Sequence, residues 1–338
     1  MLNIKNEGII LEKTGLSFES RGVLNPACIK VGNTVHMFYR AISNSFISSI
    51  GYCQLRNNKV IKRLDKPVLF PEYDYEKKGI EDPRIIFMEN LYYLTYTAYD
   101  GKNAMIAYAT SQDLINFKKG GLISPKITYE EADKIFKKVD IGKKYDYFEK
   151  IYEKNFGEEV MIWDKDACLF SKKINNKYAL LHRILPSIQV SFFSNFLELD
   201  KNYWEKYLEK INDYVVIDPE SYFENEYVGT GCPPIETSDG WLLIYHCVER
   251  VNNNLYYHSN AALLDINNPL RVLNRLKRPL FSPLEDWEKI GNVNNVVFPT
   301  GAIIDRGRLY IYYGAADKLI ACKSIELKEL LYELKTSN

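Results

Sequence analysis

The chain has 338 residues, of which 46% are hydrophobic and 26% are charged, the balance of an ordinary globular protein. Its 44 basic and 44 acidic residues give zero formal charge, so no overall field favours nucleic acid or an anionic membrane. The N-terminal stretch has no apolar core of signal-peptide length, and no run approaches the roughly 20 apolar residues of a membrane span. We therefore expect a cytoplasmic protein with no membrane partner and no nucleic-acid partner.

One pattern recurs five times along the chain: a polar turn, then a strand rich in aromatic and apolar residues. Each copy opens with glycine, asparagine or aspartate, which suits a tight hairpin. A second strand follows most copies, and short outer strands come next at 66–71, 120–125 and 278–283. The five copies span residues 32–41, 89–99, 175–184, 239–248 and 306–315.

Strand, hairpin, strand and outer strand together form the anatomy of a propeller blade. The spacings of 57, 86, 63 and 67 residues are counted from Tyr39, Tyr96, His182, Tyr245 and Tyr312. We predict an all-β fold in which residues 1–338 form a single domain, a five-bladed β-propeller with helical insertions. Because hairpins occur in every β protein, another all-β fold is the alternative.

The longest interval, between the second and third copies, contains an insertion. Residues 129–159 are charged, lack proline and carry apolar residues at helical spacing, which predicts one or two amphipathic helices. Residues 200–213 predict another helix. The charged faces of these helices are either solvated or form a lid or an oligomer contact, and a homo-oligomer is therefore one alternative.

The cysteines are scattered and form no C-x-x-C pair. Most of them lie inside apolar, strand-like runs, which predicts buried and unpaired thiols in a reducing compartment. No cluster of cysteine and histidine has metal-ligand spacing, so no metal is expected. The six residues are Cys28, Cys53, Cys168, Cys232, Cys247 and Cys322.

Polar residues lie at or near the ends of the repeated strands, and in a propeller these ends would meet at one central channel. The adjacent basic residues His182 and Arg183 end an apolar strand, where they predict either an anion site or a structural salt bridge. The residues expected to converge are Arg40, Asp100, His182, Arg183, His246 and Asp317, with Asp82 just before the inner strand of the second blade.

Asp82 stands in the stretch GIEDPRIIF, residues 79–87. A residue before proline is pushed away from the helical region, which predicts an extended Asp82 held at a fixed angle by Pro83. A carboxyl group in an aromatic-lined pocket has its pKa raised by desolvation, as a general acid requires. The alternative is a turn aspartate that makes a local hydrogen bond.

Seven stretches match a known family: NPACIKVGNTVHMFYRA, GIEDPRIIF, YYLTYTAYDGKNAMIAYATSQDLINF, LLHRILP, PPIETSDGWLLIYHCVER, AALLDINNPLRVLNR and NVNNVVFPTGAIIDRGRLYIYYGAAD. The last three together are quite specific. On these residues the chain resembles glycoside hydrolase family 130, the inverting β-mannoside phosphorylases and related β-mannosidases. The likeness covers nearly the whole chain, and the family fold is a five-bladed propeller.

The resemblance implies that Asp82 is the sole catalytic acid and protonates the glycosidic oxygen, relayed through a hydroxyl of the bound mannose. Inorganic phosphate, as co-substrate and without any cofactor, would attack the anomeric carbon from the opposite face and give α-mannose 1-phosphate. An inverting hydrolase needs a second carboxylate to activate water. A phosphorylase can omit it and needs a basic cradle for phosphate instead.

The resemblance also implies the binding residues for β-linked manno-oligosaccharide and phosphate. Lys165, His182, Arg183 and His246 are the candidates for the phosphate cradle. Asn25, Arg40 and Asp317 match positions that hold the innermost mannose, and Tyr313 is expected to offer an aromatic face to the sugar.

Two departures from the family pattern favour the hydrolytic branch. Met105 stands where several relatives carry arginine, and the insertion at 129–159 falls next to the expected cradle. An inverting β-mannosidase that uses water is therefore the second hypothesis. A non-catalytic glycan-binding propeller is the third.

Overall fold

The computed structural model describes residues 2–139, 145–157 and 159–336. Within these ranges the chain is mostly β-structure, with four hydrogen-bonded sheets and five α-helices. The mostly-β character agrees with the strand repeats of the sequence. No helix in these ranges combines the length and the apolar character that a membrane crossing requires.

The largest sheet has eight strands in two antiparallel halves, which a single parallel pair, Ser48 with Gly79, joins. The first half contains β2 (Gly22–Val31), β3 (Thr34–Ile42), β4 (Ser48–Arg56) and β5 (Lys59–Arg63). The second half contains β6 (Gly79–Met88), β7 (Leu91–Tyr99), β8 (Ala104–Ser111) and β9 (Lys118–Leu122). The large sheet thus consists of two four-stranded groups.

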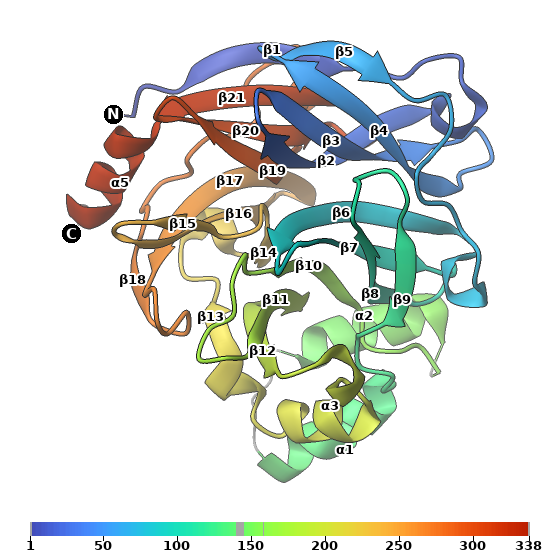
Figure 1. The fold of residues 1–338 in the computed structure, drawn as a ribbon. Coiled ribbons are helices and arrows are strands. Elements are labelled where there is room, and N and C mark those ends of the chain that lie inside the picture. Colours follow the sequence, from blue (N-terminus) through green and yellow to red (C-terminus); the bar gives the residue numbers. More distant parts are fainter. Residues whose placement is uncertain (1, 140–144, 158, 337–338) are drawn as a thin grey trace.

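Three further sheets follow in chain order, and each forms one more group (Figure 1). The third group contains β10 (Asp164–Leu169), β11 (Tyr178–Ile184), β12 (Ile188–Phe193) and β13 (Val215–Ile217). The fourth contains β14 (Tyr227–Thr230), β15 (Ile235–Thr237), β16 (Gly240–Val251), β17 (Asn254–Leu264) and β18 (Val272–Arg275). The fifth contains β19 (Val297–Asp305), β20 (Arg308–Ala315), β21 (Leu319–Glu326) and β1 (Lys5–Leu11), so strands from both ends of the chain share a sheet.

Two-residue turns connect many of the strands. Both residues of the turns Asn57–Asn58, Glu89–Asn90 and Asn252–Asn253 have positive φ. This backbone matches the twist of the flanking strands, and asparagine adopts it more readily than most residues. The asparagines therefore fix the length of each hairpin and the register of its strands.

The first strand of each group, β2, β6, β10, β14 and β19, faces the middle of the molecule (Figure 1). β2 contacts β19 and β6, and β10 contacts β6 and β14. The five strands predicted from the repeats correspond instead to the second strand of each group. Asp82 lies inside β6, so the prediction that it precedes the inner strand is wrong. Polar residues and bulges interrupt the alternation of the first strands and hide them in the sequence.

A buried glutamate joins a tyrosine and a basic side chain in four of the five groups. Glu76 accepts a hydrogen bond from the Tyr96 hydroxyl at 2.8 Å and pairs with Lys119 Nζ at 2.6 Å. It also accepts hydrogen bonds from the backbone N–H groups of Glu72 and Tyr73. The other sets are Glu19–Tyr39–Arg63, Glu224–Tyr245–Arg275 and Glu288–Tyr313–Lys323.

These sets make a testable contribution to stability. We expect Glu76→Ala to lower the free energy of unfolding by about 3–5 kcal/mol, because the buried Lys119 keeps only the half-exposed Glu72 as an ionic partner and the Tyr96 hydroxyl loses its acceptor. The Lys119 side chain is only 4% exposed. The control Glu72→Ala removes a carboxylate that is 47% exposed from the same lysine, and its cost should stay below about 1 kcal/mol. Urea unfolding measures both variants, and equal losses would contradict the assignment.

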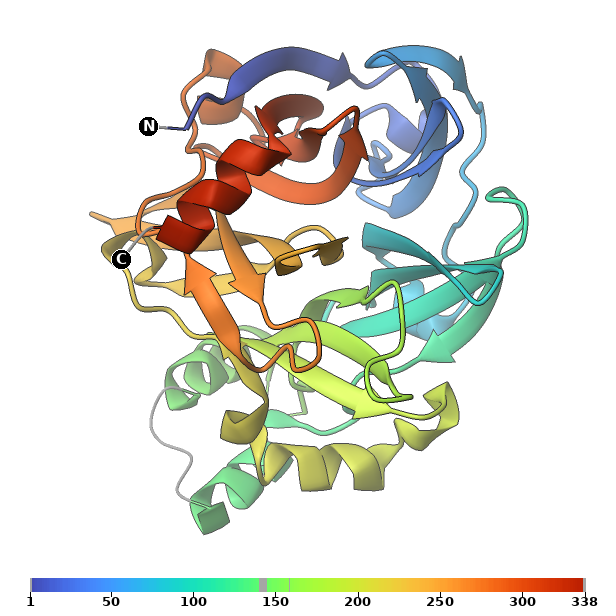
Figure 2. The same cartoon turned by 60° about the vertical axis from the view of Figure 1, so that its left-hand side comes forward.

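The helices lie at the periphery of the sheets. α1 (Tyr129–Val139), α2 (Asp146–Phe156) and α3 (Lys201–Leu208) gather beside the sheet of β10–β13 (Figures 1 and 2). They fall within the predicted insertions 129–159 and 200–213, of which residues 140–144 and 158 lie outside the described ranges. α4 (Asp286–Lys289) is a single turn, and α5 (Leu327–Thr336) packs on the fourth and fifth groups. All six cysteines are buried and unpaired, as predicted.

Candidate active site

Irregularities in the inner strands bring polar residues together in the middle of the molecule. The pairing register shifts around Asn25 in β2, Asp82 in β6, Asp166 in β10 and Thr300 in β19. Asn25, Asp82 and Asp166 have φ values of 48°, 50° and 57°. Asparagine and aspartate tolerate this left-handed backbone better than most residues. The prediction of an extended Asp82 is therefore wrong, because the bulge overrides the preference that Pro83 imposes.

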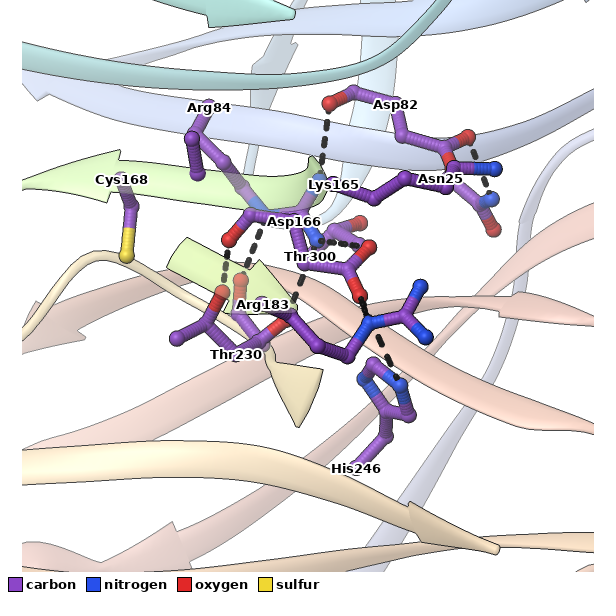
Figure 3. A network of polar contacts seen from close by, with 12 residues as sticks. Asn25, Asp82, Arg84, Lys165, Asp166, Cys168, Arg183, Thr230, His246 and Thr300 are labelled. Atoms are coloured by element: carbon purple, nitrogen blue, oxygen red, sulfur yellow. Dashed lines mark hydrogen bonds and ion pairs between the residues drawn. The ribbon is translucent and has the colours of Figure 1, made fainter. Parts of the chain in front are cut away.

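Hydrogen bonds connect the inner strands to one another (Figure 3). The Thr300 hydroxyl of β19 donates to the carbonyl oxygen of Pro26 in β2 at 2.9 Å. Asn25 Nδ2, also in β2, donates to Asp82 Oδ1 in β6 at 2.7 Å. The bulges are thus held in register by contacts between strands that are distant in the sequence.

Arg84 holds the second group against the third and fourth. Its guanidinium donates to the carbonyl oxygens of Gly231 at 2.5 Å, Asp82 at 2.8 Å and Thr230 at 3.2 Å. Arg84 Nη2 also lies 3.9 Å from Asp166 Oδ1, and its side chain is 1% exposed. The Arg84 side chain therefore positions the backbone on both sides of Asp82.

The Asp82 carboxylate is surrounded by donors and cations. Arg40 Nη1 lies 3.5 Å from Asp82 Oδ1, and Arg40 Nη2 lies 2.5 Å from Glu81 Oε1. Lys165 Nζ lies 3.7 Å from Glu81 Oε2. Glu81 and Asp82 thus share the field of Arg40 and Lys165, and the Asp82 side chain is only 6% exposed.

These neighbours set the acidity of Asp82. Burial alone would raise its pKa, but Arg40, Lys165, Arg84 and the hydrogen bond from Asn25 together bring the pKa below its ordinary value. The sequence-based expectation of a raised pKa is wrong for the unliganded protein, because the surrounding cations outweigh desolvation. Asp82 is therefore ionised at neutral pH until a ligand changes the charge around it.

A second carboxylate, Asp166, anchors the opposite side of the site. Arg183 Nε donates to Asp166 Oδ2 at 2.5 Å, and His246 Nε2 lies 3.8 Å from the same oxygen. The Thr230 hydroxyl donates to the Asp166 backbone carbonyl. The cations beside Asp166 lower its pKa despite burial, so it stays charged.

Arg183 and His246 keep unused hydrogen-bonding capacity. The terminal nitrogens of Arg183 make no contact with the residues drawn in Figure 3, and its guanidinium lies 5.0 Å from the ring centre of Tyr227. Within the described ranges, both ring nitrogens of His246 are buried without a hydrogen-bond partner. Burial lowers the pKa of His246 to about 3, so its ring is neutral. With Lys165, these side chains form a set of donors beside Asp82.

A small pocket opens next to Arg40. It has a volume of about 200 Å³, and its walls include Arg40, Ser48, Asn292 and Asp317. Burial, together with the negative charges of Asp82 and Glu81, raises the pKa of Asp317 to about 6 although Arg40 opposes the shift. Three larger pockets, of about 840, 780 and 350 Å³, lie elsewhere and are not lined by Asp82, Asp166, Lys165, Arg183 or His246.

The structure corrects two predicted site residues. His182 is fully buried, and its ring nitrogens lie 2.9 Å from Asp164 Oδ1 and 2.9 Å from the Tyr207 hydroxyl, so neither is free to bind phosphate. Tyr313 is fully buried in the core, and its hydroxyl donates to Glu288 at 2.5 Å, so its ring cannot face a sugar. Both side chains serve the packing of their sheets.

Residues 8–336 match glycoside hydrolase family 130, described as beta-1,4-mannooligosaccharide phosphorylase. The chain belongs to this family. It is 34% identical over 349 residues to a beta-1,2-mannobiose phosphorylase of Thermoanaerobacter sp. (strain X514), covering 98% of this chain and 99% of the relative. A 1,2-beta-oligomannan phosphorylase of the same organism is 31% identical over 339 residues, covering 97% and 98%. The beta-1,2-mannobiose phosphorylase of Listeria innocua, solved with beta-1,2-mannobiose, has a similar fold, with a TM-score of 0.73 at 22% identity over 99% of each chain.

Three residues of this family 130 site escaped the sequence analysis: Arg84, Asp166 and Thr230. Arg84 belongs to the stretch GIEDPRIIF and Asp166 to WDKDACLF, where a charged residue beside an apolar run was a usable signal. A buried charge is retained only when it is paired, which points to a partner in the same site. Thr230 gave no such signal, because threonine is common in strands.

Proposed function

We propose that this family 130 enzyme cleaves β-linked mannosides by phosphorolysis. The observation that carries the proposal is the donor set beside Asp82: Lys165 Nζ, the terminal nitrogens of Arg183 and the unpartnered ring of His246. All three groups can hydrogen-bond to a phosphate oxyanion, and the charges of Lys165 and Arg183 offset that of the anion. The names of the relatives, which are mannoside phosphorylases, support the same reaction.

Asp82 serves as the general acid in this reaction, and the pocket beside Arg40 holds the innermost mannose. Asn25 fixes one carboxylate oxygen of Asp82, while Arg40 contacts Asp82 and also lines the pocket. Asp317 at the pocket wall accepts hydrogen bonds from sugar hydroxyls. Phosphate attacks the anomeric carbon from the side opposite the leaving group and gives α-mannose 1-phosphate.

The alternative nucleophile, water, requires a carboxylate base. Two carboxylates near Asp82 are occupied: Glu81 pairs with Arg40 and Lys165, and Asp166 pairs with Arg183. A third, Asp317, lines the pocket that we assign to the innermost mannose. The cations that lower the pKa of Asp166 make it a poor base. The geometry therefore favours phosphate over water.

Phosphate also changes the acidity of Asp82. In the unliganded protein Lys165 and its neighbouring cations keep the pKa of Asp82 low. A bound phosphate beside Lys165 and Arg183 adds negative charge, and a bound sugar removes water, and both raise the pKa of Asp82. The acid becomes competent to donate a proton only when both substrates are present.

The architecture of the proposed enzyme is a single domain, a five-bladed β-propeller. Three observations support this architecture. The strands form five successive groups, the inner strands contact one another in the middle of the molecule, and the final sheet combines β1 with β19–β21. Inorganic phosphate is the co-substrate, and no cofactor or metal is part of the proposed reaction.

A direct assay tests the proposed function. The enzyme is incubated with β-1,2- or β-1,4-mannobiose, with and without inorganic phosphate, and the products are separated. We expect α-mannose 1-phosphate and mannose with phosphate, and no turnover without it. Equal turnover in both conditions, with mannose as the sole product, would instead identify a hydrolase.

A further inference from the structure

The inserted helix α2 contacts both arms of the donor set. On one side, the Tyr152 ring lies 4.6 Å from the ring of Trp163, and Lys165 Nζ lies 5.7 Å from the same indole. On the other side, the Phe148 ring lies 6.5 Å from the ring of Tyr227. The guanidinium of Arg183 lies over that Tyr227 ring. One helix therefore contacts both the aromatic ring beside Lys165 and the aromatic ring beside Arg183.

Tyr152 is fixed in place by other aromatic rings. Its ring stacks on Tyr129 at 5.5 Å and also approaches Phe156 at 6.4 Å, in addition to its contact with Trp163. Its hydroxyl also lies close enough to Arg183, Tyr257 and Asp166 to interact with them electrostatically. A phenol held in this way loses little conformational freedom when it binds a ligand.

Four tyrosines interact electrostatically with Arg183, and their hydroxyls differ in availability. The Tyr129 hydroxyl accepts a hydrogen bond from the Trp163 backbone N–H at 3.3 Å. The hydroxyls of Tyr227 and Tyr257 bond to each other at 2.8 Å. In the part of the chain that the structure describes, no hydrogen bond occupies the Tyr152 hydroxyl. Burial raises the pKa of Tyr152 to about 12, so the hydroxyl keeps its proton at neutral pH.

We infer that Tyr152 is a binding residue for the phosphate, and that its hydroxyl donates a hydrogen bond to a phosphate oxygen held by Arg183 and Lys165. The inference rests on the proposed function for the identity of the anion. It assigns a ligand-binding role to helix α2 of the insertion, which supplies a neutral donor beside the basic side chains.

The test measures phosphate binding directly, by calorimetric titration of the protein with inorganic phosphate in the absence of sugar. We expect Tyr152→Phe to weaken phosphate binding about tenfold, since one hydrogen bond to a charged ligand is lost. The Phe ring keeps the contacts with Trp163 and Tyr129, so Tm without phosphate should not change. Tyr147→Phe is the matched control, because Tyr147 lies on the same helix with 51% of its surface exposed.

Steady-state kinetics separate this inference from the proposed function. For Tyr152→Phe we expect a KM for phosphate about tenfold higher, with the KM for the mannoside unchanged. If the wild type hydrolyses mannosides without phosphate and Tyr152→Phe still weakens phosphate binding, the proposed function is refuted but the role of Tyr152 in anion binding is supported. Wild-type phosphorolysis with an unchanged phosphate affinity in Tyr152→Phe would overturn the inference alone. Absence of phosphate binding to the wild type would overturn both.

Discussion

We expect Asp82→Asn to reduce turnover of β-mannobiose by about 10³-fold or more, because an amide cannot donate the proton that the leaving oxygen needs. Asparagine is the informative substitution at this position. The backbone of Asp82 has φ of 50°, which asparagine tolerates and alanine does not. The hydrogen bond from Asn25 Nδ2 can also persist, to the amide oxygen of the new side chain. The loss therefore reports on the chemistry and not on the fold.

Two measurements accompany the rate for Asp82→Asn. Its affinity for inorganic phosphate, measured by titration, should stay the same or increase, since a negative charge near Lys165 and Arg40 has been removed. Its Tm should remain close to that of the wild type. If the variant retains most of the wild-type turnover, Asp82 is not the acid. A large fall in Tm would show that the carboxylate is needed for folding.

The strands were predictable where side chains alternate, and less so where they do not. β3, β7, β11, β16 and β20 alternate or run apolar between asparagine-rich and glycine-rich turns, and the sequence predicts each of them. The inner strands contain bulges at Asn25, Asp82 and Asp166. A bulge depends on the register between two strands, and a single sequence does not contain that register.

The same physics explains the two wrong site residues. Neighbours in a regular strand face opposite sides of the sheet, so His182 and Arg183 could not both reach one anion. The structure puts Arg183 at the site and His182 against Tyr207 of α3. Tyr312 and Tyr313 also face opposite sides of their sheet. Tyr39, Tyr96 and Tyr245 each donate a hydrogen bond to a buried glutamate, and in the fifth group Tyr313, not Tyr312, makes this bond. The alternation of side chains along a strand would therefore have excluded one residue of each pair from the site.

A bulge reverses this rule at Asp82. Glu81 and Asp82 are adjacent in β6, yet both contact Arg40, because the left-handed backbone at Asp82 turns its side chain to the same side. The sequence motif therefore singled out Asp82 but could not show its surroundings. The cations that lower the pKa of Asp82 come from three strands, β3, β6 and β10, that only the folded chain brings together.

Arg183→Ala should raise the KM for phosphate about 100-fold, because two charge-assisted hydrogen bonds to the anion are lost. The terminal nitrogens of Arg183 make no contact with the other residues drawn in Figure 3, while Nε remains bound to Asp166. kcat at saturating phosphate should fall less, since Asp82 and the sugar pocket are intact. Initial rates over a range of phosphate concentrations separate the two parameters.

The variant has a second effect that must be removed before the KM can be interpreted. Without Arg183, the Asp166 carboxylate, which is 1% exposed, lacks its main partner, and we expect a loss of about 3–5 kcal/mol in the free energy of unfolding. The double variant Asp166→Asn/Arg183→Ala abolishes the unpaired charge, and asparagine tolerates the φ of 57° at position 166.

Stability and phosphate binding should therefore respond differently in the two variants. The double variant should recover most of the lost stability in urea unfolding, because no buried carboxylate is left without a partner. Its KM for phosphate should remain about 100-fold above the wild-type value, since the donors are still missing. A double variant with normal KM for phosphate would remove Arg183 from the anion site and leave it as the structural partner of Asp166. The cradle would then reduce to Lys165 and His246, whose neutral ring carries no charge to offset that of phosphate.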